Sequence, residues 1–159
     1  MIDPGQKITE LTLQSQAGWV LVTAALFADS LERLLLTKMR TLSNKKAKQM
    51  FKNGPLRNLA AKIDLAWAFE LVDDPVHHDP TVIRDIRNEF AHSITAVNFD
   101  SPEVIKHMKK FKGWNAKVDQ FDFFVERFKS CFLPITAKRD QELMVNALRK
   151  KPAQGILGH

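Results

Sequence analysis

The residues whose types and spacing could do chemistry lie together between positions 84 and 93. Arg87, Asn88 and His92 place a guanidinium, a carboxamide and an imidazole in one short stretch. An imidazole can donate or accept a proton near neutral pH, and a guanidinium can stabilise negative charge that develops on a reacting group. On an ideal helix Arg87 and His92 point about 140° apart. They form one candidate catalytic site only if the helix ends or bends near His92, or if a second subunit completes it.

A structural role for the same arginine is the interpretation that we favour. Ile83, Ile86 and Phe90 recur at helical spacing and predict a buried stripe. Arg87 falls about 40° from Ile83 on the helical wheel, at the margin of that stripe. A charged side chain in this position needs a partner, because an unpaired buried charge is very costly.

The predicted partner of Arg87 is Asp64, which lies between two apolar residues of another predicted helix. Asp29 and Glu32, on a third helix, are the alternatives. His92 then has a position near a helix C-terminus, where the helix dipole favours a cationic imidazole. We therefore expect Asp64, Arg87 and His92 to form a structural motif.

The other chemistry-bearing residues predict neither a metal site nor a cofactor. His77, His78 and Asp79 are consecutive, but a zinc site needs three or four ligands and no Cys/His pairs at ligand spacing accompany them. We expect a solvated loop here, with Asp79 as the cap of the next helix. Cys131, the single cysteine, lies in an apolar stretch and should be a buried, unreactive thiol.

Helical periodicity runs through most of the chain, and glycine and proline punctuate it. The predicted helices are 8–16, 19–40, 43–51, 56–72, 79–92, 100–113, 118–132 and 134–150. This pattern predicts an all-α fold, a single-domain bundle of about seven or eight helices over residues 1–151. We expect the tail 152–159 to be disordered. On the helix 118–132, Phe121, Phe124 and Phe128 should face the core, and Phe123 should be an exposed contact for a partner helix.

The composition and the apolar segments of the chain indicate the compartment in which the protein lies. The 159 residues are 45% hydrophobic and 26% charged, as in a globular protein. One cysteine suits a reducing compartment, the first residues lack the pattern of a signal peptide, and the longest apolar stretch is too short to span a bilayer. We therefore expect a cytoplasmic protein without membrane contact.

Direct reading of a DNA sequence is not expected. The net charge of +6 permits an anionic partner, but most of the excess lysine and arginine falls on predicted solvated helix faces. A helix-turn-helix needs two short helices and a polar reading face. The segments 43–51 and 56–72 come nearest to this arrangement, and the second of them is too apolar to enter a groove.

Four segments, in succession, resemble the signatures of the mannitol operon repressor family of bacterial regulators. The segments are 51–56 (FKNGPL), 61–66 (AKIDLA), 83–93 (IRDIRNEFAHS) and 99–104 (FDSPEV). The resemblance covers about residues 19–112. It implies an all-helical fold, a role in repressing a sugar-alcohol uptake operon, and action through protein partners without a DNA-reading motif.

The run from Arg87 to His92 also resembles the arginine, four residues, histidine signature of the wider HEPN superfamily. That resemblance implies a metal-independent ribonuclease, often dimeric. In such an enzyme His92 would move a proton as a ribose 2′-hydroxyl attacks the phosphate, and Arg87 would stabilise the charge on phosphorus. Many members of the superfamily are non-enzymatic.

Our expectation from the sequence is therefore a non-enzymatic transcriptional regulator that binds an unidentified protein partner, such as another transcription regulator. A second copy of the chain is a further candidate partner. The alternatives are a ribonuclease that uses Arg87, Asn88 and His92, and a plain interaction module with no link to mannitol.

Overall fold

The computed structural model describes residues 4–150, and within this range the protein is all-helical, with no strand. Its helices are α1 (Pro4–Lys38), α2 (Asn44–Phe51), α3 (Leu59–Ala68), α4 (Asp74–His92), α5 (Pro102–Met108) and α6 (Gln120–Lys150). The all-α prediction is confirmed. The six described helices are slightly fewer than the seven or eight predicted, and the tail 152–159 lies outside the described residues.

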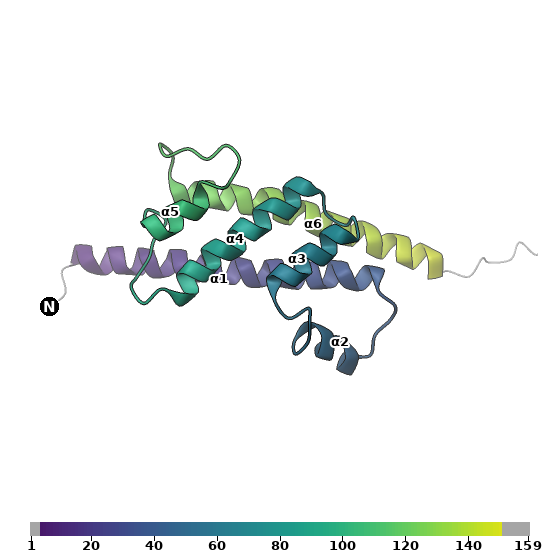
Figure 1. Ribbon diagram of the computed structural model, residues 1–159. Coiled ribbons are helices and arrows are strands. Elements are labelled where there is room, and N and C mark those ends of the chain that lie inside the picture. Colours follow the sequence, from purple (N-terminus) through teal and green to yellow (C-terminus); the bar gives the residue numbers. More distant parts are fainter. Residues whose placement is uncertain (1–3, 151–159) are drawn as a thin grey trace, which may run out of the picture.

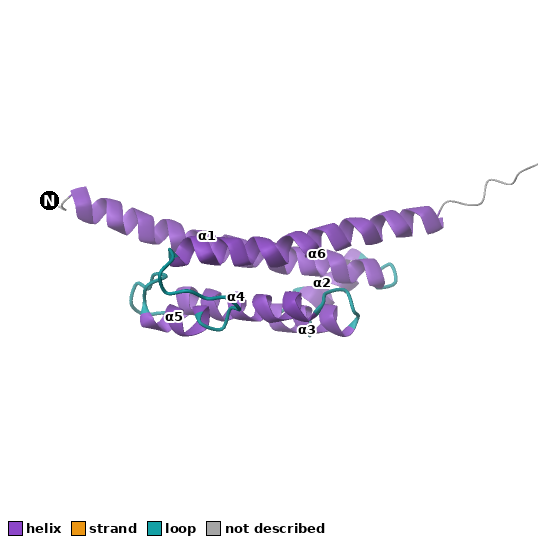
Figure 2. Ribbon diagram, turned by 90° about the horizontal axis from the view of Figure 1, so that it is seen from above, coloured by secondary structure: helices purple, strands orange, loops and turns teal. Residues whose placement is uncertain are grey.

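The helices form two layers. The long helices α1 and α6 lie side by side and run in the same direction, and α2, α3, α4 and α5 lie on one side of this pair (Figures 1 and 2). α1 packs against α3, α4 and α6, and α4 also packs against α3, α5 and α6. The last turns of α6 project beyond the other helices (Figure 1). None of the described helices has the length and hydropathy that a membrane-spanning segment requires.

Two predicted helix breaks do not occur, and this accounts for the lower number of helices. Gly18 lies inside α1 and Pro134 lies inside α6. A proline in a helix interior removes one hydrogen bond and costs about 3 kcal/mol. Cys131 and Ile135, on either side of Pro134, are buried. Because tertiary packing supplies most of the stability of a helix, α6 continues through its proline.

Both layers contribute to one apolar core. Its fully buried large side chains are Phe27, Phe51, Phe124, Leu31, Leu34, Leu35, Ile63, Ile83, Ile86, Met108, Ile135 and Val20. The predicted stripe of α4 is therefore in place, with Phe90 packed against the core from its edge. Phe123, predicted to be exposed, instead packs against Phe111 with their ring centroids 6.1 Å apart.

α4 begins earlier than predicted, and this moves Asp79 from a helix cap to the core. Asp73 is the actual cap, since its side chain accepts a hydrogen bond from the Val76 backbone N–H at 3.1 Å. Residues 77–79 are consequently helical, and Pro80 lies inside the helix. Asp79 stands four residues before the buried Ile83, on the same helix face, and is only 5% exposed.

Candidate functional site

The predicted ion pair between Arg87 and Asp64 is not formed. Arg87 is half-buried on α4, and its Nη1 donates a hydrogen bond to Asn88 Oδ1 at 3.2 Å. The carboxylate of Asp64 is 71% exposed and lies 3.0 Å from His77 Nε2. The prediction that Arg87 is largely buried against Asp64 is therefore wrong.

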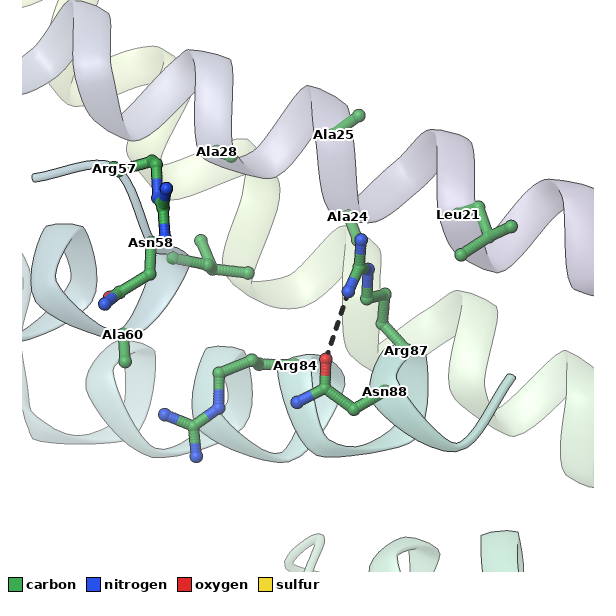
Figure 3. Close-up of a pocket in the computed structure, with 11 residues that line it drawn as sticks. Leu21, Ala24, Ala25, Ala28, Arg57, Asn58, Ala60, Arg84, Arg87 and Asn88 are labelled. Carbon is green, nitrogen blue, oxygen red and sulfur yellow. Dashed lines mark hydrogen bonds between the residues drawn. The ribbon is translucent and has the colours of Figure 1, made fainter. Parts of the chain in front are cut away.

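The direction in which each side chain leaves its helix explains this difference. α3 buries Lys62, Ile63 and Ala66, so Asp64, one position after Ile63, points to solvent. Arg87 extends from α4 towards α1 (Figure 3). An acid beside apolar residues in the sequence indicates that its helix packs, but it does not indicate which face the acid occupies.

His92 does not join Arg87 and Asn88. It is the last residue of α4, near the helix C-terminus as expected, and its side chain is exposed. The cavity that Arg87 and Asn88 line does not include it. α4 therefore brings two of the three candidate catalytic residues to one place and leaves the imidazole outside it.

Arg87 and Asn88 line a cavity of about 530 Å³ between α1, the start of α3 and α4 (Figure 3). The wall from α1 is made of small or apolar residues, and the opposite wall carries the polar side chains together with Leu59 and Ala60. The lining residues are Leu21, Ala24, Ala25, Ala28, Arg57, Asn58, Leu59, Ala60, Arg84, Arg87 and Asn88. Single-sequence reasoning found Arg87 and Asn88 but missed Arg57 and the start of α3, because nothing local connects them to α4.

All of the charged residues that line this cavity are arginines. Arg84 turns away from α1 (Figure 3) and binds the carboxylate of Asp85 at 2.8 Å. Arg57 and Arg87 project into the space between the layers (Figure 3). Among the described residues, the arginines that form ion pairs are Arg33, Arg84, Arg127 and Arg139. The guanidinium groups of Arg57 and Arg87 therefore have no carboxylate partner in the described part of the chain.

The start of α3 also lines this cavity, through Asn58, Leu59 and Ala60. Asn58 caps the helix, since its Oδ1 accepts from the Ala61 backbone N–H at 2.8 Å, and its backbone oxygen accepts from Lys62 at 3.4 Å. The N–H groups of Leu59 and Ala60 come before these bonds and belong to the first turn, where helical N–H groups have no acceptor within the helix. A helix start carries partial positive charge and binds anions readily.

The chemistry that this lining offers is the binding of negative charge. It holds guanidinium groups, a carboxamide and backbone N–H donors, and it holds no carboxylate, imidazole, thiol or hydroxyl. General acid–base catalysis needs a group within hydrogen-bond reach that can exchange a proton near neutral pH. A guanidinium stays protonated at such pH values.

A network of charges on the other side of α4 connects it to α5. His107 Nε2 and Lys106 Nζ each lie 3.0 Å from Glu89 Oε1, and these hydrogen bonds hold the pKa of Glu89 below its ordinary 4.5. Burial raises the pKa of Asp85, but the bonds from Arg84 and Lys110 outweigh burial and the net shift is downward. These carboxylates are tied into a structural contact between two helices.

The buried Asp79 and the half-buried Arg127 form an ion pair that the sequence reasoning missed. Arg127 Nη2 donates to Asp79 Oδ2, and the guanidinium lies 5.7 Å from the centre of the Phe111 ring. The spacing of Asp79 from Ile83 could have indicated that both residues face the core. The sequence prediction missed this because it began the helix at Asp79.

The described residues contain no cluster of three or more His, Cys, Asp or Glu side chains suited to a metal ion. Cys131 is 2% exposed, its Sγ donates to the Phe128 carbonyl oxygen at 3.3 Å, and burial raises the pKa of its thiol to about 12. A thiol that is protonated and enclosed in this way is a poor nucleophile.

The chain matches no protein-family model, and it has no significant match among curated proteins or among solved structures.

Proposed function

We propose that this protein is a cytoplasmic, non-enzymatic transcriptional regulator of the mannitol operon repressor type, and that it acts by binding a protein partner. The four segments that resemble that family, in succession along the chain, support the regulatory role. The geometry supports the mode of action, because it offers apolar surface for a protein contact and a charged cavity without a proton-transfer group.

The observation that carries the proposal is the apolar surface at the end of α6. Leu143, Met144 and Leu148 are 52%, 68% and 63% exposed and lie near the C-terminal end of α6, whose last turns project beyond the other helices (Figures 1 and 2). Clustered apolar side chains on a protein surface mark sites of interaction with other molecules. Met144 and Leu148 are one helical turn apart, so a partner can contact both at once.

The packing of α3 argues against direct reading of DNA. α2 and α3 are the pair of helices nearest to a helix-turn-helix, and α2 exposes several lysines. α3 buries Ile63 and Ala66 against the core and packs on α1 and α4. A helix held in this way cannot enter a major groove, whereas a recognition helix must present its side chains to base edges.

The regulatory proposal is tested in the host organism by measuring transcripts of its sugar-alcohol uptake operon. We expect deletion of the gene to raise the transcript level when no sugar alcohol is supplied, and the wild-type gene to restore repression. The double variant Met144→Glu/Leu148→Glu should fold normally, because both side chains are exposed, and should fail to restore repression. The matched control Gln141→Glu should restore it. An unchanged transcript level in the deletion strain would refute the proposal.

A ribonuclease is the second candidate function. It is supported by the position of Arg87 and Asn88, which both line the cavity. Purified protein incubated with RNA in the presence of a metal chelator tests this activity directly. Cleavage that is abolished by Arg87→Gln and by His92→Gln, with unchanged melting temperatures, would establish the ribonuclease. Intact RNA would leave the regulator as the better account.

A further inference from the structure

The cavity between α1, α3 and α4 combines a polar side and an apolar side in a space of ligand size. A volume of about 530 Å³ falls in the range of pockets that hold small molecules. Ala24, Ala25 and Ala28 give one wall a shallow apolar surface, because an alanine side chain projects by only one carbon. A small molecule can therefore lie along α1 and reach the donors on the opposite wall.

The donors on that wall lie in two groups. One group is at the start of α3, where Arg57 immediately precedes the cap Asn58 and the first-turn N–H groups of Leu59 and Ala60. The other group is on α4, where Arg87 Nη1 donates to the neutral oxygen of Asn88. That bond leaves the remaining guanidinium donors of Arg87 for a ligand, since an arginine has five N–H donors.

We propose that this cavity binds a small organic phosphate. The phosphate group accepts hydrogen bonds from the Leu59 and Ala60 backbone N–H groups and from Arg57, and the organic part lies against the alanines of α1. A second acceptor group of the ligand bonds to Arg87. Phosphate suits this site because an arginine fork and a helix start both match its oxygens.

The proposal concerns binding alone, so it extends beyond the regulatory function and does not rest on it. Neither the apolar end of α6 nor the transcript measurement enters the argument for the cavity. A failure to bind phosphate compounds would leave the regulatory proposal standing, and an unchanged transcript level would leave the cavity proposal standing.

The test is isothermal titration calorimetry of the purified protein with inorganic pyrophosphate and with ribose 5-phosphate, at constant ionic strength. We expect saturable binding, weakened about tenfold or more by Arg57→Gln and by Arg87→Gln, as for the loss of a hydrogen bond to a charged group. The control Arg149→Gln removes the same charge from an exposed site near the end of α6 and should leave the affinity unchanged. Equal weakening by all three variants would refute a specific site.

A measurement on the wild-type protein keeps the test independent of how the variants fold. In a titration with pyrophosphate followed by amide NMR, the Leu59 and Ala60 backbone signals should shift most. The proposal is overturned if neither compound binds, if the largest shifts fall outside the cavity, or if an RNA oligonucleotide binds at Arg57 and Arg87 while both small phosphates do not.

Discussion

At the scale of single residues, the charges that are buried differ from those that the sequence indicated. Lys62 is 4% exposed, with its Nζ 3.3 Å from Glu32 Oε2, and Asp79 pairs with Arg127. Each pair joins helices that are distant in the sequence. Asp64 and Arg87 were expected to pair because both lie beside apolar residues, but neighbours in the sequence do not determine which side of a helix a residue occupies.

Replacing Asp79 by asparagine should destabilise the protein by about 2–3 kcal/mol. Removal of one member of a buried ion pair leaves the other charge uncompensated, at a cost of roughly 3–5 kcal/mol when both are fully buried. The side chain of Arg127 is 28% exposed, so water recovers part of this cost. Chemical denaturation followed by circular dichroism measures the change in the free energy of unfolding.

The matched control is Asp64→Asn, which removes the same charge from a carboxylate that is 71% exposed. Exposed ion pairs contribute only about 0–1 kcal/mol, so this variant should unfold almost as the wild type does. Equal losses of stability in the two variants would contradict the assignment of Asp79 to the core and Asp64 to the surface.

At the scale of elements, the helical structure of each segment was predictable from the sequence, but several helix boundaries were not. The segment 43–51 was predicted almost to the residue, because Ser43 is a local cap that accepts from the Lys46 N–H at 3.2 Å. The ends of α1 and α6 were not, because Gly18 and Pro134 signal breaks that long-range packing overrides. The cavity could not be predicted for the same reason, because Arg57 and Arg87 come to line it only when α3 and α4 pack against α1.

Gly54, in the loop that follows α2, should not tolerate even alanine. A Cβ atom at this position would lie 2.3 Å from the Gln49 backbone oxygen, and backbone cannot move aside as a flexible side chain can. Gly54→Ala should therefore lower the free energy of unfolding by about 1–3 kcal/mol, as for other overpacked sites. A thermal melt followed by circular dichroism measures the loss.

Gly18→Ala should have the opposite effect on the stability of the protein. A Cβ atom at Gly18 meets nothing within 4 Å, and alanine is favoured over glycine in a helix interior by about 0.5–1 kcal/mol. This variant should melt at a higher temperature than the wild type. If both glycine variants shifted the melting temperature in the same direction, the close backbone approach at Gly54 would not be the cause of its effect.

At the scale of the whole molecule, carboxylates hold helices together in a chain that has an excess of positive charge. Glu142 on α6 accepts a hydrogen bond from Lys38 of α1 at 2.7 Å, and Glu89 joins α4 to α5. The net charge is +6. Protonation of these carboxylates therefore removes contacts between helices and increases the repulsion within the molecule at the same time.

Acid should destabilise the protein in a pH range that these carboxylates set. The hydrogen bond from Lys38 holds the pKa of Glu142 below 4.5, and the pKa values of Glu89 and Asp85 are also lowered. A lowered pKa means that the folded state binds fewer protons than the unfolded chain, so this stability is complete above the ordinary values and is lost as the pH falls through the lowered ones. The melting temperature should change little from pH 7 to about pH 5.5 and fall steeply from about pH 5 to 3.

The triple variant Asp85→Asn/Glu89→Gln/Glu142→Gln separates these three groups from all other carboxylates of the chain. It should melt at a lower temperature than the wild type at pH 7, because the bonds to charged partners are weaker, and its melting temperature should fall less steeply between about pH 5 and 3. The difference in melting temperature between the wild type and the triple variant at pH 7 should also shrink in 1 M salt, because the lysines that bind these carboxylates are 40–58% exposed. A triple variant whose melting temperature falls as steeply as that of the wild type would place the acid sensitivity in other carboxylates.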